Sequence, residues 1–193
     1  MSKNRVQLLA EIAIFATLAM VLDIFTEPMQ IGPWISFSFK MIPIFIVAFR
    51  WGIGAGMSAG FLWGLLQVVT GEAASGILSP LQGFLEYFLA FTLIGLAGLA
   101  KPWVDKARAQ KASGQILAYS LIGVLLGTTA RYIIHFIAGF FFWGQYAPEG
   151  QSAVLYSLSV NGLSWLGETL ACVLVIWLAQ PMMTFFLTTG RKA

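Results

Sequence analysis

The chain has 193 residues, of which 59% are hydrophobic and 10% charged, with a mean hydropathy of +0.83. A soluble domain of this size carries far more charge, so this composition predicts a membrane protein. The net charge of +3 does not indicate nucleic-acid binding, because the basic residues lie beside apolar segments rather than in one patch.

Six segments are apolar enough to be candidates for transmembrane helices, which need about 20 largely apolar residues. Their approximate cores are residues 8–25, 40–50, 53–69, 80–100, 115–143 and 160–187. We therefore expect an all-α integral membrane protein, with six transmembrane helices forming a single domain over residues 1–193. The first segment is expected to be retained, because no small-residue cleavage site follows it. The second contains Pro43, which predicts a kink or tilt.

The Lys and Arg residues predict the orientation of these spans. Nine of the eleven fall on one side of a six-span arrangement. They are Lys3, Arg5, Arg50, Lys101, Lys106, Arg108, Lys111, Arg191 and Lys192. The loops on the other side carry no Lys or Arg, so both termini are expected in the cytoplasm of a multi-pass plasma-membrane protein. The two remaining basic residues, Lys40 and Arg131, need a separate explanation.

A glycine stripe runs along the third segment. Gly52, Gly56, Gly60 and Gly64 recur every four residues, which places them on one helix face and lets another helix approach closely. Packing within the chain is the favoured interpretation. Docking against a second membrane protein is the alternative.

Polar residues inside the spans are candidate functional residues, because they are costly in lipid. Glu86 lies roughly 9 Å, and His135 roughly 12 Å, from the outer end of its span at 1.5 Å per residue. Asn161 begins the sixth span from the same side. The outer loops add aromatic residues, namely Trp34, Tyr146 and Tyr156. These positions predict a pocket that opens outward.

The stretch HFIAGFFFWGQYAP gives this pocket one wall. At 100° per residue, His135, Gly139 and Trp143 share a helical face with Arg131 and Phe142. Gly139 leaves a gap between the imidazole and the indole that a flat ring could enter. The alternative is an interfacial aromatic belt with one buried, hydrogen-bonded histidine.

Other polar residues are expected to be structural. Ser79, Pro80 and Gln82 predict an N-terminal capping box for the fourth span. Arg131 and Glu168 lie at similar depth and predict an intramembrane ion pair. Charged residues near span ends are expected to be solvated, and these are Glu11, Asp23 and Glu72.

The sequence lacks the residues that several kinds of chemistry require. There is no G-x-x-x-x-G-K-[ST] phosphate loop for ATP hydrolysis. A single histidine and a single cysteine, Cys172, disfavour a zinc site and exclude an intrachain disulfide. Cys172 is expected to be a small packing residue. No nucleophile–base pair stands out, so the sequence favours binding over catalysis, with no cofactor and no metal.

Three stretches together resemble a known family. PLQGFLEY, RYIIHFIAGFFFWGQYAP and VLYSLSVNG, in this order and spacing, resemble the thiamine-specific substrate-binding component of energy-coupling factor transporters. The resemblance covers nearly the whole chain. It implies capture of extracellular thiamine and assembly with a transmembrane coupling protein and two cytoplasmic ATPases. The family docks through an A-x-x-x-A pattern in the first span, where Ala13-x-x-x-Thr17 is the nearest match here.

The resemblance also implies site residues. Glu86 would hydrogen-bond the aminopyrimidine of thiamine and Trp143 would stack on a ring. The remaining members would complete or cover the pocket, and they are Trp34, Tyr87, His135, Gly139, Tyr156 and Asn161. The outer loop TGEAASGILS lacks the aromatic residue of some family members, which leaves its closure over the ligand open.

Three alternatives remain at this point. The same fold could bind another small aromatic or cationic molecule. An integral-membrane enzyme could use Glu86 and His135 as acid and base. A scaffold protein could have the glycine stripe as its main feature.

Overall fold

The computed structural model describes residues 3–26 and 35–187, and all regular secondary structure in these ranges is helical. This confirms the all-α prediction for the described residues. Four helices in these ranges are long and apolar enough to cross a membrane. They are α1 (Lys3–Thr26), the continuous helices Pro80–Ala109 and Ser113–Tyr146, and α8 (Ala153–Leu178). The shorter helices are α2 (Ile42–Trp51), α3 (Ile53–Val69) and α9 (Met183–Leu187).

The two central helices change their winding along their length. Helix Pro80–Ala109 comprises α4 (Pro80–Gly83), η3 (Phe84–Leu89), α5 (Ala90–Leu93), η4 (Ile94–Ala100) and α6 (Lys101–Ala109). Helix Ser113–Tyr146 comprises α7 (Ser113–Ala138), η5 (Gly139–Trp143) and η6 (Gly144–Tyr146). η3 and η5 are π-helical, whereas η4 and η6 are 3₁₀-helical.

Two helices extend beyond the predicted span cores. The fourth segment extends beyond residue 100 through the polar, basic α6. The sixth begins at Ala153 rather than near residue 160, because the Ser152 hydroxyl caps the helix by accepting the Leu155 N–H. It ends at Leu178, just before Pro181.

The second predicted span, residues 40–50, corresponds to α2 and is short. α2 has 10 residues, about 15 Å of helix, or half of a hydrocarbon core of about 30 Å. Pro43 lies in the first turn of α2, where proline removes no hydrogen bond of the helix, and the predicted kink or tilt stays a prediction. The extended stretch before α2 takes its partners from α8. The Ser36 N–H donates to Ser164 Oγ at 2.9 Å, and the Ser38 hydroxyl donates to Glu168 at 3.0 Å. Such internal partners make extended backbone tolerable at membrane depth.

The glycine stripe packs within the chain. Gly52 has a φ of +95° and lets the chain reverse between α2 and α3. A Cβ on Gly60 would lie 2.1 Å from the Phe91 carbonyl oxygen, and one on Gly64 would lie 1.7 Å from that of Tyr87. The glycines therefore let α3 touch the backbone of η3 and α5. This confirms the interpretation of intrachain packing and contradicts docking of a second protein on this face.

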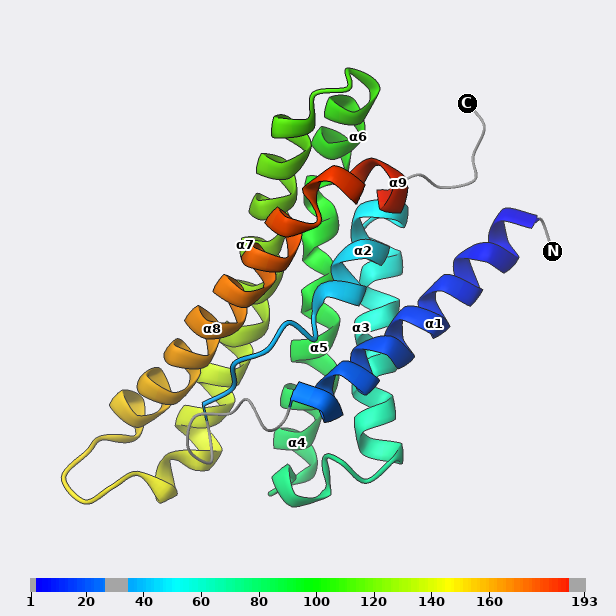
Figure 1. Cartoon of the computed structure of the whole chain (residues 1–193). Coiled ribbons are helices and arrows are strands. Elements are labelled where there is room, and N and C mark those ends of the chain that lie inside the picture. The colour runs from blue at the N-terminus through cyan, green and yellow to red at the C-terminus, as the bar shows by residue number, and fades with distance from the viewer. Residues whose placement is uncertain (1–2, 27–34, 188–193) are drawn as a thin grey trace.

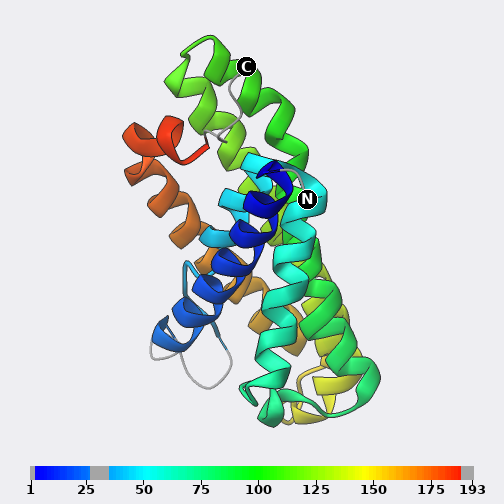
Figure 2. The same cartoon turned by 90° about the vertical axis from the view of Figure 1, so that its right-hand side faces the viewer.

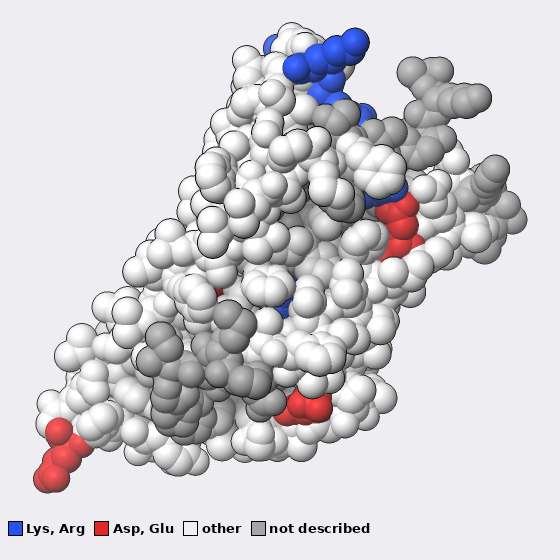
Figure 3. Space-filling model, viewed as in Figure 1, with Lys and Arg blue, Asp and Glu red and all other residues white. Residues whose placement is uncertain are grey.

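The two ends of the bundle differ in charge. The α2–α3 and α6–α7 turns lie at one end with α9, whereas the end of α3 and the η6–α8 connection lie at the other (Figures 1 and 2). Most Lys and Arg atoms visible in Figure 3 gather over the α6–α7 turn. The basic residues on this face therefore mark the first end.

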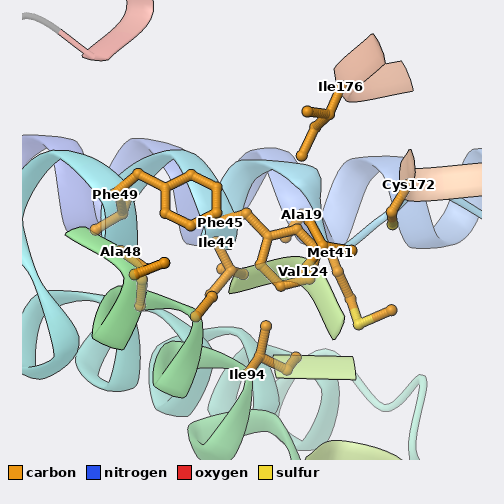
Figure 4. Packing of buried hydrophobic residues seen from close by; sticks show 14 of the residues in the cluster. Ala19, Met41, Ile44, Phe45, Ala48, Phe49, Ile94, Val124, Cys172 and Ile176 are labelled. Atoms are coloured by element: carbon orange, nitrogen blue, oxygen red, sulfur yellow. The ribbon is translucent and has the colours of Figure 1, made fainter. Parts of the chain in front are cut away.

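The apolar core lies between α2 and the central helices (Figure 4). Phe45 and Phe49 of α2 stack with ring centroids 6.4 Å apart, and buried Ile94 and Val124 belong to the same cluster. Cys172 is also fully buried in it, as predicted for a packing residue.

The predicted ion pair is part of a larger cluster of interior charges. Arg131 Nη1 lies 3.7 Å from Glu168 Oε2, which confirms the pair. Lys40 Nζ lies 3.4 Å from Glu168 Oε1 and 2.8 Å from Asp23 Oδ1. This interior charge cluster (Asp23, Lys40, Arg131 and Glu168) joins α1, α7 and α8 and explains both unassigned basic residues.

Two acidic residues expected to be solvated are paired instead. Asp23 contacts Lys40, and the Glu11 carboxylate lies 2.8 Å from Arg50 and also accepts the Trp51 indole N–H. The prediction was wrong because Lys40, Arg50 and Trp51, which are distant in sequence, lie against α1 in the fold. Glu72 is exposed, as expected.

Candidate functional site

A cavity of about 230 Å³ lies where η2 (Ala74–Gly76), η3, η5 and the first turns of α8 meet. Its lining consists of Gly76, Glu86, Tyr87, Gly139, Trp143, Tyr156, Ser157, Val160 and Asn161. These elements lie at the end of the bundle away from the α6–α7 turn (Figure 1). The structure therefore brings together most of the residues that the sequence singled out.

Both central helices are π-helical where they border the cavity. η3 carries Glu86 and Tyr87, and η5 carries Gly139 and Trp143. A π-turn spreads the backbone hydrogen bonds of an α-helix and is frequent at functional sites. The sequence analysis assumed α-helical phase throughout, so it did not predict this winding.

Glu86 is the carboxylate of the cavity, and its side chain is 12% exposed. Its Oε2 accepts two hydrogen bonds, one from Trp143 Nε1 at 3.2 Å and one from the Gln82 amide. Its Oε1 faces His135 Nδ1 at 3.9 Å, beyond hydrogen-bond distance. The carboxylate is thus fixed through Oε2 at the cavity lining, with His135 next to its other oxygen.

Trp143 presents ring surface to the cavity. Its indole nitrogen lies in the ring plane, so the bond to Glu86 occupies the edge of the ring and not its faces. Tyr146 contacts the same indole, with centroids 5.7 Å apart. Aromatic faces of this kind attract flat cations by about 0.5–2 kcal/mol.

His135 lies behind Glu86 rather than in the cavity lining. Arg131 Nε donates to His135 Nε2 at 3.2 Å, so this nitrogen must accept. The remaining nitrogen, Nδ1, then carries the hydrogen of the neutral imidazole and points at Glu86. Arg131 in turn lies over the Phe91 ring, 4.5 Å from its centroid. His135 therefore connects the cavity carboxylate to the interior charge cluster.

Helix α8 forms the opposite wall. Asn161 Nδ2 donates to the carbonyl and hydroxyl oxygens of Ser157, and Ser157 Oγ donates to the Phe136 carbonyl at 2.7 Å. A Cβ on Gly139 would lie 2.4 Å from Ser157 Oγ and 2.8 Å from Asn161 Nδ2. The gap predicted at Gly139 is thus partly taken by α8, which approaches η5 closely there.

Comparison with known proteins places the chain in a family. A family model described as thiamine transporter protein matches residues 9–186. The chain belongs to this thiamine transporter family. The thiamine transporter ThiT of Lacticaseibacillus paracasei is 41% identical to it over 167 residues, covering 86% of this chain and 83% of that protein. ThiT of Bacillus subtilis is 37% identical over 181 residues, covering 92% and 91%.

A solved structure agrees with the family assignment. The structure of ThiT from Listeria monocytogenes superposes with a TM-score of 0.88 at 37% identity, covering 95% of this chain and 98% of that one. Family membership and the long apolar helices identify the chain as a membrane transport protein rather than an enzyme.

Sequence reasoning about this thiamine transporter family member missed several residues at the cavity. Gly76, Ser157 and Val160 line it, and fully buried Gln82 holds Glu86 from behind. Ser157, Val160 and Gln82 belong to stretches that carry the family resemblance, but nothing in the sequence shows which way their side chains point. Trp34, the predicted cover, lies outside the described residues.

The capping prediction was half right. The Ser79 hydroxyl accepts the Gln82 N–H at 3.2 Å, and Pro80 begins the helix. The Gln82 side chain does not return to the Ser79 N–H, because its oxygen accepts from Leu78 instead. Among the described residues, no group of three or more His, Cys, Asp or Glu side chains could hold a metal ion.

Proposed function

We propose that this chain captures extracellular thiamine with high affinity, as the substrate-binding subunit of an ATP-driven vitamin importer. The observation that carries the proposal is the pairing of the Glu86 carboxylate with the Trp143 indole at one cavity. Thiamine joins an aminopyrimidine, which donates hydrogen bonds from its amino group, to a flat thiazolium cation. The Glu86 carboxylate would accept from the amino group, and Trp143 would stack on a ring.

The remaining predicted residues have supporting places in this site. Tyr87, Gly139, Tyr156 and Asn161 line the cavity, and His135 backs Glu86. In the proposal the first four shape the space around the ligand. His135 holds the carboxylate from behind, and Trp34 covers the opening.

The charges around the cavity favour a monocation. Glu86 and the interior charge cluster together hold three carboxylates and two cations, and the Arg131 contact keeps His135 neutral. These described groups therefore carry one net negative charge in a low-dielectric setting, where uncompensated charge is costly. Thiamine brings one positive charge. A doubly charged phosphate ester would reverse the balance, so at most weak acceptance of phosphates is expected.

The alternative ligands fit less well. A cavity of about 230 Å³ is smaller than the ~300–1,000 Å³ that hold drug-sized molecules. It suits a small two-ring cation better than a larger vitamin such as riboflavin. An enzyme using Glu86 and His135 as acid and base finds no support, since His135 accepts from Arg131 and lies outside the cavity lining.

The membrane arrangement and partners belong to the same proposal. Six spans with both termini in the cytoplasm would place the cavity at the outer face of the plasma membrane, consistent with the basic end of the bundle (Figure 3). A transmembrane coupling protein and two cytoplasmic ATPases would supply the energy. Helix α1 would dock, and its Thr17 hydroxyl folds back onto the Ala13 carbonyl at 2.9 Å, which keeps that face apolar despite the missing alanine.

Replacing Glu86 with glutamine tests the ligand contact. Gln82 and Trp143 both donate to Oε2, so the new amide must turn its oxygen toward them and place its NH₂ group where Oε1 stood, and the negative charge is lost. Thiamine binding should weaken by about 1–3 kcal/mol, the range for a lost charge-assisted hydrogen bond. Isothermal titration measures this. Exposed Glu72→Gln is the control and should bind normally, whereas unchanged affinity in Glu86→Gln would remove Glu86 from the site.

A further inference from the structure

The amide of Gln82 makes three hydrogen bonds in the wall of the cavity. Its Nε2 donates to the Gly76 carbonyl at 2.9 Å and to Glu86 Oε2, and its Oε1 accepts the Leu78 N–H at 2.9 Å. The side chain is fully buried. Both amide hydrogens are therefore used, one on the loop before α4 and the other on the cavity carboxylate.

These bonds connect two parts of the cavity wall. Gly76 lines the cavity from the loop, and Glu86 lines it from η3. Gly76 also packs so closely on Tyr87 that a Cβ there would lie 2.3 Å from the phenol oxygen. A shift of the Gln82 amide would therefore release both the loop and the carboxylate.

We propose that Gln82 is a positioning residue that determines selectivity for ligands with an amino-substituted ring. It acts through Glu86, whose Oε2 it holds together with Trp143, so that the carboxylate keeps one orientation at the cavity lining. This inference rests on the proposed function. In this inference Gln82 touches no ligand itself but fixes the orientation of Glu86, which does.

Only an amide can fill this role at this position. Glutamate has the same length but lacks both donors, and it would place a second carboxylate against Glu86. Methionine has a similar volume and makes none of the three bonds. Both substitutions free the Glu86 carboxylate to rotate away from the cavity and leave the Gly76 carbonyl without its partner.

The test is a double-mutant cycle with two ligands. The affinities of the detergent-purified full chain for thiamine and for oxythiamine, which carries an oxo group in place of the amino group, are measured by titration. Gln82→Met is expected to weaken thiamine binding by about tenfold or more and to change oxythiamine binding much less. In a Glu86→Gln background, the same change should cost much less thiamine affinity, because Gln82 then positions a neutral amide that has already lost the charge-assisted bond to the ligand.

The matched control is Gln67→Met. Gln67 is a buried amide that donates to another carboxylate, Asp23, away from the cavity lining. It should leave both affinities unchanged. Gln82→Glu provides a second variant with the same expected pattern.

Three results would overturn the inference, because each would make Gln82 merely structural. The first is an equal loss of affinity for thiamine and oxythiamine, and the second is an additive effect of the two substitutions in the double mutant. The third is misfolding of both Gln82 variants. A wild-type chain that binds no thiamine would instead overturn the proposed function itself. The two failures are thus distinguishable.

Discussion

Gly64→Ala is expected to abolish the native packing of α3 against η3. The new Cβ would lie 1.7 Å from the Tyr87 carbonyl oxygen, and the neighbour is backbone that cannot rotate aside. Overpacking of a core costs about 1–3 kcal/mol where side chains can adjust, and the cost here should reach or exceed that range. Because Tyr87 follows Glu86 directly, displacement of η3 should also weaken thiamine binding.

The same helix offers a matched control for this change. A Cβ on Gly54 meets no other atom within 4 Å, so Gly54→Ala should be tolerated. Thermal unfolding of the two variants in detergent compares them directly. A Gly64→Ala protein that unfolds at the wild-type temperature would show that α3 does not touch η3 as described.

Glu168→Ala is expected to destabilise the chain by about 3–5 kcal/mol, the cost of breaking a buried ion pair by removing one partner. Glu168 is fully buried and faces both Lys40 and Arg131. Its loss leaves two cations in the bundle interior with Asp23 as their remaining partner within the interior charge cluster. The hydroxyls of Ser36 and Ser38 lose their acceptor as well, which should loosen the extended stretch before α2.

Thermal unfolding also measures this effect, with Glu149→Ala as the control. Glu149 is an exposed carboxylate in the η6–α8 connection, and its removal should change stability by no more than about 0.5 kcal/mol. Equal unfolding temperatures for Glu168→Ala and the wild type would contradict the role given to the cluster.

Much of the candidate site was predictable because polar and charged residues within apolar spans cost free energy in lipid. A carboxylate such as Glu86 within an apolar span indicates a functional role, and Arg131 and Glu168 at similar depth indicate an ion pair. Spacing along two helices was enough to place Glu86 and Trp143 at the same end. The family resemblance then supplied a ligand that needs both a carboxylate and an aromatic face.

Other features depend on contacts that spacing does not encode. The extended stretch before α2 precedes the predicted second span, residues 40–50, and nothing in its sequence shows that Ser36 and Ser38 find their partners on the distant residues Ser164 and Glu168. Asp23 looked solvated because its partner, Lys40, follows an intervening loop. Gln82 fits a capping box in sequence, whereas its amide turns instead toward Gly76 and Glu86.

The winding of the helices also escaped prediction. Residues 84–89 and 139–143 are rich in aromatic residues, and no pattern in them distinguishes a π-turn from an α-turn. The helical spacing also placed His135 in the same wall as Gly139 and Trp143. In the structure it lies behind the cavity, between Arg131 and Glu86.

The central claim is that thiamine binds against Trp143, and titration with thiamine followed by tryptophan fluorescence tests it most directly. The chain has seven tryptophans, so Trp143→Phe is compared with Trp103→Phe, which changes a half-exposed indole on α6. We expect saturable quenching at submicromolar thiamine in the wild type and in Trp103→Phe, and its loss in Trp143→Phe. An unresponsive wild type that instead bound riboflavin or biotin would contradict the assignment.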